Sequence, residues 1–330
     1  MNETPPAPTP EEQVAEEPAS ENLTPEQFAD ALMERHIPII SREKAELAAR
    51  TILETIPPPP KGLLRALAEN FRFIDQAEFK TVLAALAEKI TADFDNGTFG
   101  KPFWTCDTKG KSTEWMQSLL AQKIPEETQG INVPETHADK MFIPPHTTPS
   151  AILIFDDWLL SGGHLQDNVL RPLITKLRKL FGKPPKILCY CLFGIEESRE
   201  DLESKINAEF PDFKVQIFIQ DPSLAPLTAI GVPHYAWLEE LSQDMSEEHR
   251  LAGFSALKPG DSLLCGWWKI PDNIPDALTR TESPYRFIDR AQITPPYHQI
   301  DAGAEEGPED SFWQYLFWKL KKLWSGSSGN

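Results

Sequence analysis

The segment from Ala151 to Leu165 constrains the fold more than any other part of the chain. It reads AILIFDDWLLSGGHL, in which an apolar run meets two acids and a Ser-Gly-Gly-His turn follows after three more apolar residues. An apolar run of this kind predicts a strand buried on both faces, as in parallel sheets covered by helices. Glycines after such a strand let backbone N–H groups approach an anion, and the start of the next helix favours negative charge there.

Strands and helices alternate on both sides of this segment. Helical spacing of apolar residues predicts helices at 113–123, 165–181 and 196–210. Short apolar runs predict strands at 103–106, 140–143, 151–155, 186–193 and 213–219. This alternation implies a parallel sheet with right-handed crossovers, whose ligands bind beyond the carboxyl ends of the strands. We therefore expect an α/β fold, a parallel twisted sheet flanked by helices, with Asp156 and Asp157 at one such end.

The chain before residue 96 is predicted to be a helical addition to this sheet. Thr24-Pro25-Glu26-Gln27 is typical of a helix start, and two helices are expected, to about residue 35 and over 41–55. Pro57–Pro60 ends the second of them. Asp75 begins another helix, which should cover one side of a core with apolar residues at helical spacing: Phe79, Val82, Leu83, Leu86, Ile90 and Phe94.

The expected organisation has five parts. Residues 1–23 are predicted to be a disordered, acidic and proline-rich tail, because they contain hardly any aliphatic side chains. Residues 24–95 form the helical region and residues 96–300 the α/β domain. Residues 301–310 form an acidic linker, and residues 311–330 an amphipathic aromatic helix with a short tail.

The charge of the chain lies mostly in its two ends. The net charge is −18, and the first 35 residues and residues 301–310 are strongly acidic. In the remainder, acids and bases nearly balance. An extensive nucleic-acid-binding surface needs clustered Lys and Arg, so the sequence argues against one.

The cysteines indicate a reducing compartment. The chain has 4 cysteines, no Cys-x-x-Cys pair, no apolar run long enough to span a membrane and no secretory signal. Cys189 and Cys191 alternate within an apolar run, which favours two buried thiols over a metal site. We expect a cytoplasmic protein.

The residues from Ile152 to His164 resemble the loop that binds 5-phosphoribosyl 1-pyrophosphate (PRPP) in type I phosphoribosyltransferases. The family pattern is four apolar residues, two acids, three variable residues and Thr-Gly-x-Thr. Ser161 and His164 stand where the family has threonines. The resemblance implies that the two acids hold the ribose hydroxyls and Mg²⁺, and that the turn holds the 5-phosphate through Ser161, Gly162, Gly163 and His164. The alternative is an exposed acidic strand end with a glycine-rich turn.

A second phosphate-binding segment is expected after the strand at 103–106. Lys109, Gly110 and Lys111 stand just before a predicted helix, where two lysines and a glycine can hold a phosphate group. Their position in the chain resembles that of the pyrophosphate loop of the same family. The alternative is a solvated loop.

The segment from Leu263 to Pro275 carries a further resemblance. It reads LLCGWWKIPDNIP and is similar to the C-terminal segment of phosphoribosyltransferase-like proteins of bacterial conflict and antiphage systems, including retron-associated ones. In this segment Trp268 could stack a nucleobase, or both tryptophans could be packing residues. Purine-salvage relatives carry an acid where this chain has Leu160, which cannot transfer a proton, so ordinary purine salvage is not expected.

The last predicted helix has one strongly apolar side. Residues 311–324 read SFWQYLFWKLKKLW, with large apolar residues on one stripe and three lysines beside it. Three alternatives stay open: the helix docks on the protein's own body, on a partner protein or on a membrane surface.

Together the resemblances favour an enzyme, a phosphoribosyltransferase-like effector of antiviral defence. It would bind PRPP with Mg²⁺ as cofactor and transfer ribose 5-phosphate to an unknown acceptor. The alternative is a binding module that senses PRPP or a nucleotide without catalysis and regulates a partner protein.

Overall fold

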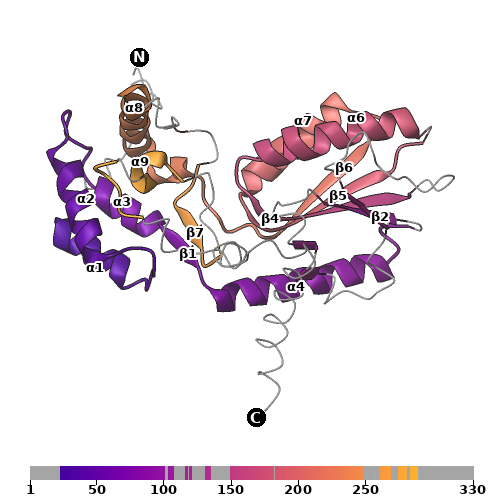
Figure 1. Cartoon of the computed structure of the whole chain (residues 1–330), viewed down its shortest axis with the longest axis horizontal. Coiled ribbons are helices and arrows are strands. Elements are labelled where there is room, and N and C mark those ends of the chain that lie inside the picture. Colours follow the sequence, from indigo (N-terminus) through magenta and orange to yellow (C-terminus); the bar gives the residue numbers. More distant parts are fainter. Residues whose placement is uncertain are drawn as a thin grey trace, which may run out of the picture.

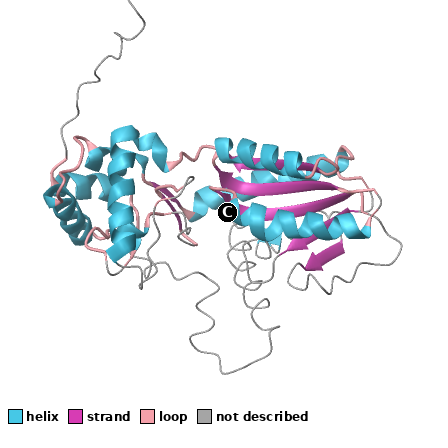
Figure 2. Ribbon diagram, turned by 90° about the horizontal axis from the view of Figure 1, so that it is seen from above, coloured by secondary structure: helices cyan, strands magenta, loops and turns pink. Residues whose placement is uncertain are grey.

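The computed structural model describes residues 23–100, 103–107, 116–117, 119–120, 131–134, 149–181, 183–248, 257, 261–268, 274–280 and 283–288. Within this part, Figure 1 shows a helical lobe at one end and a sheet flanked by helices at the other. A long helix and a two-stranded ribbon connect them. Figure 2 shows that the helices beside the sheet run along the direction of its strands.

The main sheet has five parallel strands and confirms the predicted α/β fold. The strand order is β3-β2-β4-β5-β6, with bounds β2 (Phe103–Asp107), β3 (Ile131–Pro134), β4 (Ala151–Leu159), β5 (Lys186–Gly194) and β6 (Lys214–Asp221). The winding direction reverses between β2 and β4. In open sheets of this type, ligands bind at that reversal, outside the carboxyl ends of the strands.

Both faces of the sheet are apolar because its central strands are buried on both sides. All nine residues of β4 are buried. Ile152 and Ile154 face one core, with the helices η4 (Leu165–Leu170), α6 (Arg171–Leu180) and α7 (Glu196–Glu209). Leu153 and Phe155 face the opposite core, where α4 (Gln76–Asp95) lies. The predicted helix over 165–181 is confirmed, although its first turns are π-helical.

Helix α4 closes the second face as the sequence predicts. Asp75 caps it by accepting a hydrogen bond from the Glu78 N–H at 2.8 Å. Its buried residues repeat at helical spacing: Phe79, Leu83, Leu86, Ala87 and Ile90. Near its end, Tyr190 of β5 donates a hydrogen bond to Asp93 at 2.8 Å, which ties the helix to the sheet.

The helical lobe contains more than the N-terminal helices. It comprises α1 (Pro25–Met33), α2 (Arg42–Glu54), α3 (Leu63–Asn70), η5 (Leu227–Ile230), α8 (Val232–Glu248) and α9 (Asp276–Thr279). Thr24 caps α1 with the predicted capping box.

One hydrophobic core joins both sets of helices in this lobe. Phe28 of α1 meets Phe287 edge to face, with ring centroids 5.5 Å apart, and Leu238 and Leu278 lie in the same core. The short helices of residues 24–70 cannot bury their apolar faces alone, so described residues between Leu227 and Ile288 complete the core. Residues on both sides of the boundary expected at residue 96 thus share this core.

One strand of the described sheet was not predicted, and one predicted strand is not tested. Strand β3 at 131–134 was not predicted, since it is a short edge strand that ends in proline. The strand expected at 140–143 lies outside the described residues, as does most of the helix expected at 113–123.

A parallel two-stranded ribbon lies between the lobes. Strand β1 (Arg72–Ile74) pairs with β7 (Leu264–Gly266), so segments far apart in the chain meet there. The Arg72 N–H donates to the Leu263 carbonyl at 2.8 Å, and the Trp267 N–H donates to the Ile74 carbonyl at 3.0 Å.

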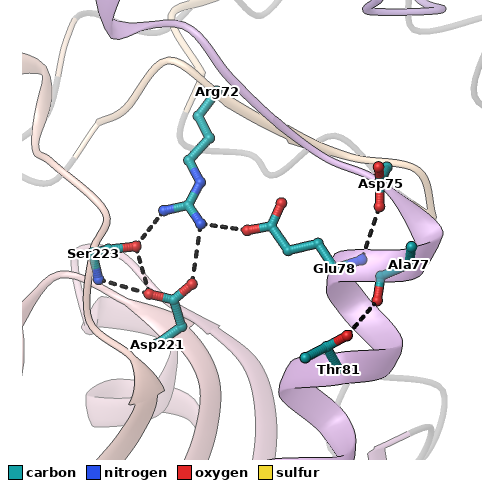
Figure 3. A network of polar contacts seen from close by, with 7 residues as sticks. All are labelled: Arg72, Asp75, Ala77, Glu78, Thr81, Asp221 and Ser223. Atoms are coloured by element: carbon teal, nitrogen blue, oxygen red, sulfur yellow. Dashed lines mark hydrogen bonds and ion pairs between the residues drawn. The ribbon is translucent and has the colours of Figure 1, made fainter.

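Arg72 connects this ribbon to α4 and to the main sheet (Figure 3). Its guanidinium pairs with Asp221 at the end of β6, at 3.0 Å, and with Glu78 of α4, and it also donates to Ser223. Burial would by itself raise the pKa of Asp221. Hydrogen bonds from the hydroxyl and N–H of Ser223, together with Arg72, outweigh burial, so the pKa is lowered.

We expect Asp221→Asn to destabilise the fold by about 1–2 kcal/mol at neutral pH, because a charge-assisted network at a partly exposed site is lost. A lowered folded-state pKa stabilises the fold above the ordinary value of 3.8 and loses this effect as pH falls through the folded value. The difference between wild type and variant should therefore shrink in urea unfolding series from pH 6 towards pH 2.5.

The exposed carboxylate of Asp201, which pairs with Lys205 on α7, provides a matched control. Asp201→Asn should change stability by less than about 0.5 kcal/mol at neutral pH. An Asp221→Asn effect that is equally small would show that the network does not hold the lobes together.

Candidate active site

The two predicted acids lie inside strand β4 rather than after it. The strand was expected to end at Phe155 but continues to Leu159, because Trp158 and Leu159 still pair with Phe193 and Gly194 of β5. Both carboxylates are consequently covered: Asp156 is 4% and Asp157 1% exposed. The alternative interpretation, an exposed acidic strand end, does not agree with this burial.

The Asp156 carboxylate is held by local backbone. Its Oδ1 accepts a hydrogen bond from the Asp157 N–H at 2.8 Å. Across the sheet, Asp156 pairs with Cys191. Burial, and then the charge of Asp156, raise the pKa of the Cys191 thiol well above its usual value. Cys191 therefore stays protonated at neutral pH and is not a nucleophile for this site.

The Asp157 carboxylate is held by a residue from a distant part of the chain. The indole Nε1–H of Trp268 donates to Asp157 Oδ2 at 3.0 Å. Trp268 is 0% exposed and stacks on Trp158, with ring centroids 4.8 Å apart and an 8° angle between the planes. A completely covered ring offers no face to a nucleobase, so the structure favours the packing interpretation for Trp268.

The predicted phosphate turn follows β4 directly. Ser161 and His164 are exposed, while Gly162 is buried with a φ of +72°, a conformation that favours glycine. A Cβ on Gly162 would also lie 3.0 Å from Leu202. The Gly163 N–H lies 3.4 Å from Ser161 Oγ. The chain thus makes a tight turn whose outer side presents Ser161 and His164.

A helix begins at this turn. The Gln166 N–H donates to the Gly162 carbonyl at 2.8 Å, and the His164 ring lies 3.0 Å from the Asn168 amide. The six residues Leu165–Leu170 are π-helical, a conformation found frequently at functional sites and one that apolar spacing does not reveal. The early N–H groups of such a helix favour an anion beside the turn.

The acid pair lies at the reversal point of the sheet. In the pairing of β2 with β4, Cys106 lies opposite Ile154. Strand β2 ends one residue later, at Asp107, so its end lies at about the same level of the sheet as the two acids. Lys109, Gly110 and Lys111 follow Asp107 and lie outside the described residues. Residues 269–273 and the predicted helix at 311–324 also lie outside them.

The carboxylates of Asp156 and Asp157 could bind Mg²⁺ only together with other ligands. Among the described residues, no group of three or more His, Cys, Asp or Glu side chains could hold a metal ion. Mg²⁺ is usually bound by one or two carboxylates, with substrate phosphates and waters completing its six ligands. Asp156, beside Cys191 of one core, and Asp157, bonded to Trp268 of the other, could each supply one carboxylate to such a site.

The comparison with known families agrees with this geometry. Residues 59–283 match the PRTase-CE family, over more than half of the chain. The chain belongs to the PRTase-CE family. This family is phosphoribosyltransferase-like, as the β4 motif indicates. The PRTase-CE match begins just before α3 and ends beyond α9, so it includes much of the helical lobe. A comparison with curated proteins found no match.

In the described part of this PRTase-CE protein, no helix is long and apolar enough to cross a membrane. Cys189, Cys191 and Cys265 are buried and form no disulfide bond, and burial was expected for the first two.

We expect Cys191 to resist alkylation in the folded protein, because its thiol is buried and its pKa is raised. Iodoacetamide at pH 8 should leave it unmodified in native protein and modify it fully in urea, as measured by peptide mass spectrometry. Rapid native modification would contradict the buried position beside Asp156.

Proposed function

We propose that this protein binds PRPP with Mg²⁺ and transfers its ribose 5-phosphate to an acceptor, with release of pyrophosphate. One observation carries the proposal. Two buried carboxylates lie in β4, and a glycine turn that starts a helix follows this strand, at the reversal of a parallel sheet. Membership of a phosphoribosyltransferase-like family supports the same chemistry.

Asp156 and Asp157 would accept hydrogen bonds from the ribose 2′- and 3′-hydroxyls and hold the metal ion. A carboxylate in a site with little water binds a hydroxyl more strongly than an exposed one does. When bound, Mg²⁺ would neutralise charge on the pyrophosphate group.

The turn after β4 would hold the 5-phosphate. Ser161 offers a hydroxyl, Gly162 and Gly163 offer backbone N–H groups, and His164 offers a ring N–H. The exposed positions of Ser161 and His164 suit a ligand that arrives from solvent. The acids and the turn would therefore hold opposite ends of one ribose phosphate.

Lys109, Gly110 and Lys111 would hold the pyrophosphate. Chain geometry supports this role: Lys109 follows Asp107 by two residues, which span at most about 7 Å. Because β2 lies beside β4, the segment starts at the same edge of the sheet as the acids.

The rate of transfer would come from orientation and charge stabilisation. The C1–O bond to pyrophosphate breaks while the acceptor forms a new bond to C1, and the leaving group keeps the electron pair. Fixed donors around the leaving group stabilise its charge. Leu160 is 3% exposed and cannot remove a proton, so the acceptor must be nucleophilic without help from that position.

A non-catalytic sensor of PRPP or a nucleotide is the second candidate. The near-complete burial of both carboxylates favours a sensor. A ligand can reach covered carboxylates only if the protein changes conformation, and that change can signal binding to a partner. Pyrophosphate release distinguishes the two: an enzyme with its acceptor releases it over many turnovers, whereas a sensor releases none.

The cellular role that we propose is an effector of bacterial antiviral defence in the cytoplasm. The likeness of Leu263–Pro275 to conflict-system proteins supports the role. Three buried cysteines that form no disulfide bond suit a reducing compartment. Residues 311–324 would then bind a partner protein, with docking on the body or on a membrane surface as the other outcomes.

We expect PRPP with Mg²⁺ to raise the melting temperature of the wild type by several degrees, since a ligand that binds only the folded state stabilises it. Asp156→Asn with Asp157→Asn should abolish this shift and leave a folded apo protein, as checked by circular dichroism. The exposed pair change Asp201→Asn with Asp212→Asn is the matched control and should keep the shift. No shift of the wild type at millimolar PRPP would contradict the proposal.

We expect deletion of residues 306–330 to leave the PRPP-induced shift unchanged and to abolish capture of the partner. Thermal shift and co-purification from the native host measure the two effects on one truncated protein. Loss of folding on deletion would show instead that the aromatic segment belongs to the core.

A further inference from the structure

The contact between Trp268 and Asp157 joins two completely buried groups. The indole N–H donates to Asp157 Oδ2 at 3.0 Å, and the two residues are 0% and 1% exposed. They lie 111 residues apart in the sequence. A hydrogen bond to a charged acceptor is stronger than a neutral one, more so where water is excluded.

The Trp268 ring is fixed from several sides. It stacks on Trp158 at 4.8 Å, and Phe79 of α4 lies against it with ring centroids 4.6 Å apart. Gly266 lies directly beside the ring, since a Cβ there would come within 2.6 Å of Trp268 Cζ3. The Trp267 N–H, bonded to the Ile74 carbonyl at 3.0 Å, anchors the preceding residue to β1. The donor therefore has little freedom to turn away from Asp157.

We propose that Trp268 is a positioning residue, whose N–H orients the Asp157 carboxylate for the ribose hydroxyls of the ligand. This inference rests on the proposed function. It gives the ribbon of β1 and β7 a role in ligand binding, because Trp268 follows β7 by two residues. It also replaces base stacking as the function of this tryptophan.

Trp158 provides a matched control within the same stack. Its ring is 8% exposed and parallel to that of Trp268, and its Nε1–H is buried with no hydrogen-bond partner among the described residues. A change to Phe at either position removes similar ring volume from the stack. Only the change at Trp268 removes the bond to Asp157.

The experiment compares full-length wild type, Trp268→Phe and Trp158→Phe by isothermal titration calorimetry. The probes are PRPP with Mg²⁺, which carries the ribose hydroxyls, and pyrophosphate with Mg²⁺, which lacks them. We expect Trp268→Phe to weaken PRPP binding roughly tenfold, the usual effect of one charge-assisted hydrogen bond. Its pyrophosphate affinity, and both affinities of Trp158→Phe, should stay within about twofold of wild type.

Several results would overturn the inference. Equal loss of PRPP affinity in both variants would make the stack a packing unit only, and parallel loss of PRPP and pyrophosphate would indicate general damage. Wild-type binding of PRPP with unchanged binding by Trp268→Phe would overturn the positioning role alone. Failure of the wild type to bind PRPP would overturn the proposed function and this inference with it.

An isosteric replacement of Trp268 separates the loss of its N–H from damage to the fold. 3-Benzothienylalanine at position 268 keeps the bicyclic shape and the stack but replaces the N–H by sulfur. The same tenfold selective loss of PRPP affinity is expected from it, and retention of wild-type affinity would refute a role for the N–H.

Discussion

Burial of two adjacent carboxylates is the constraint on which the rest of this structure depends. Removing a carboxylate from water costs several kcal/mol even after the protein relaxes, so buried acids need donors that replace water. Asp156 receives the N–H of Asp157, and Asp157 receives the indole N–H of Trp268. Buried carboxylates attract hydroxyl groups and cations, which the proposed ribose phosphate and its metal ion would supply.

The donor to Asp157 comes from a segment that follows the main sheet in the chain and returns to it. Trp268 follows β7, and β7 is held by β1, whose Arg72 also pairs with Asp221 at the end of β6. The ribbon thus contacts the main sheet at two strands. The N-terminal helices share one core with described residues between Leu227 and Ile288. The family match, which starts at residue 59, fits this arrangement.

Features that depend on nearby residues could be predicted from the sequence. The cap at Thr24, helix α4 and the buried strand that carries Asp156 all follow from spacing within about twenty residues. Features that depend on distant pairing could not. Strands β1 and β7 have three residues each and no periodic signal, and nothing in the local pattern assigns the Trp268 N–H to Asp157. Strand β4 is longer than predicted because its pairing with β5 continues past the two acids and Trp158.

The most direct test of the account is a crystal structure of the protein with ribose 5-phosphate and Mg²⁺. The account predicts density for the sugar between β4 and the turn, with its hydroxyls on Asp156 and Asp157 and its phosphate on the backbone N–H groups of Gly162 and Gly163. Ligand bound elsewhere, with the Asp157–Trp268 region unchanged and closed to it, would contradict the central claim that these carboxylates form the ribose site.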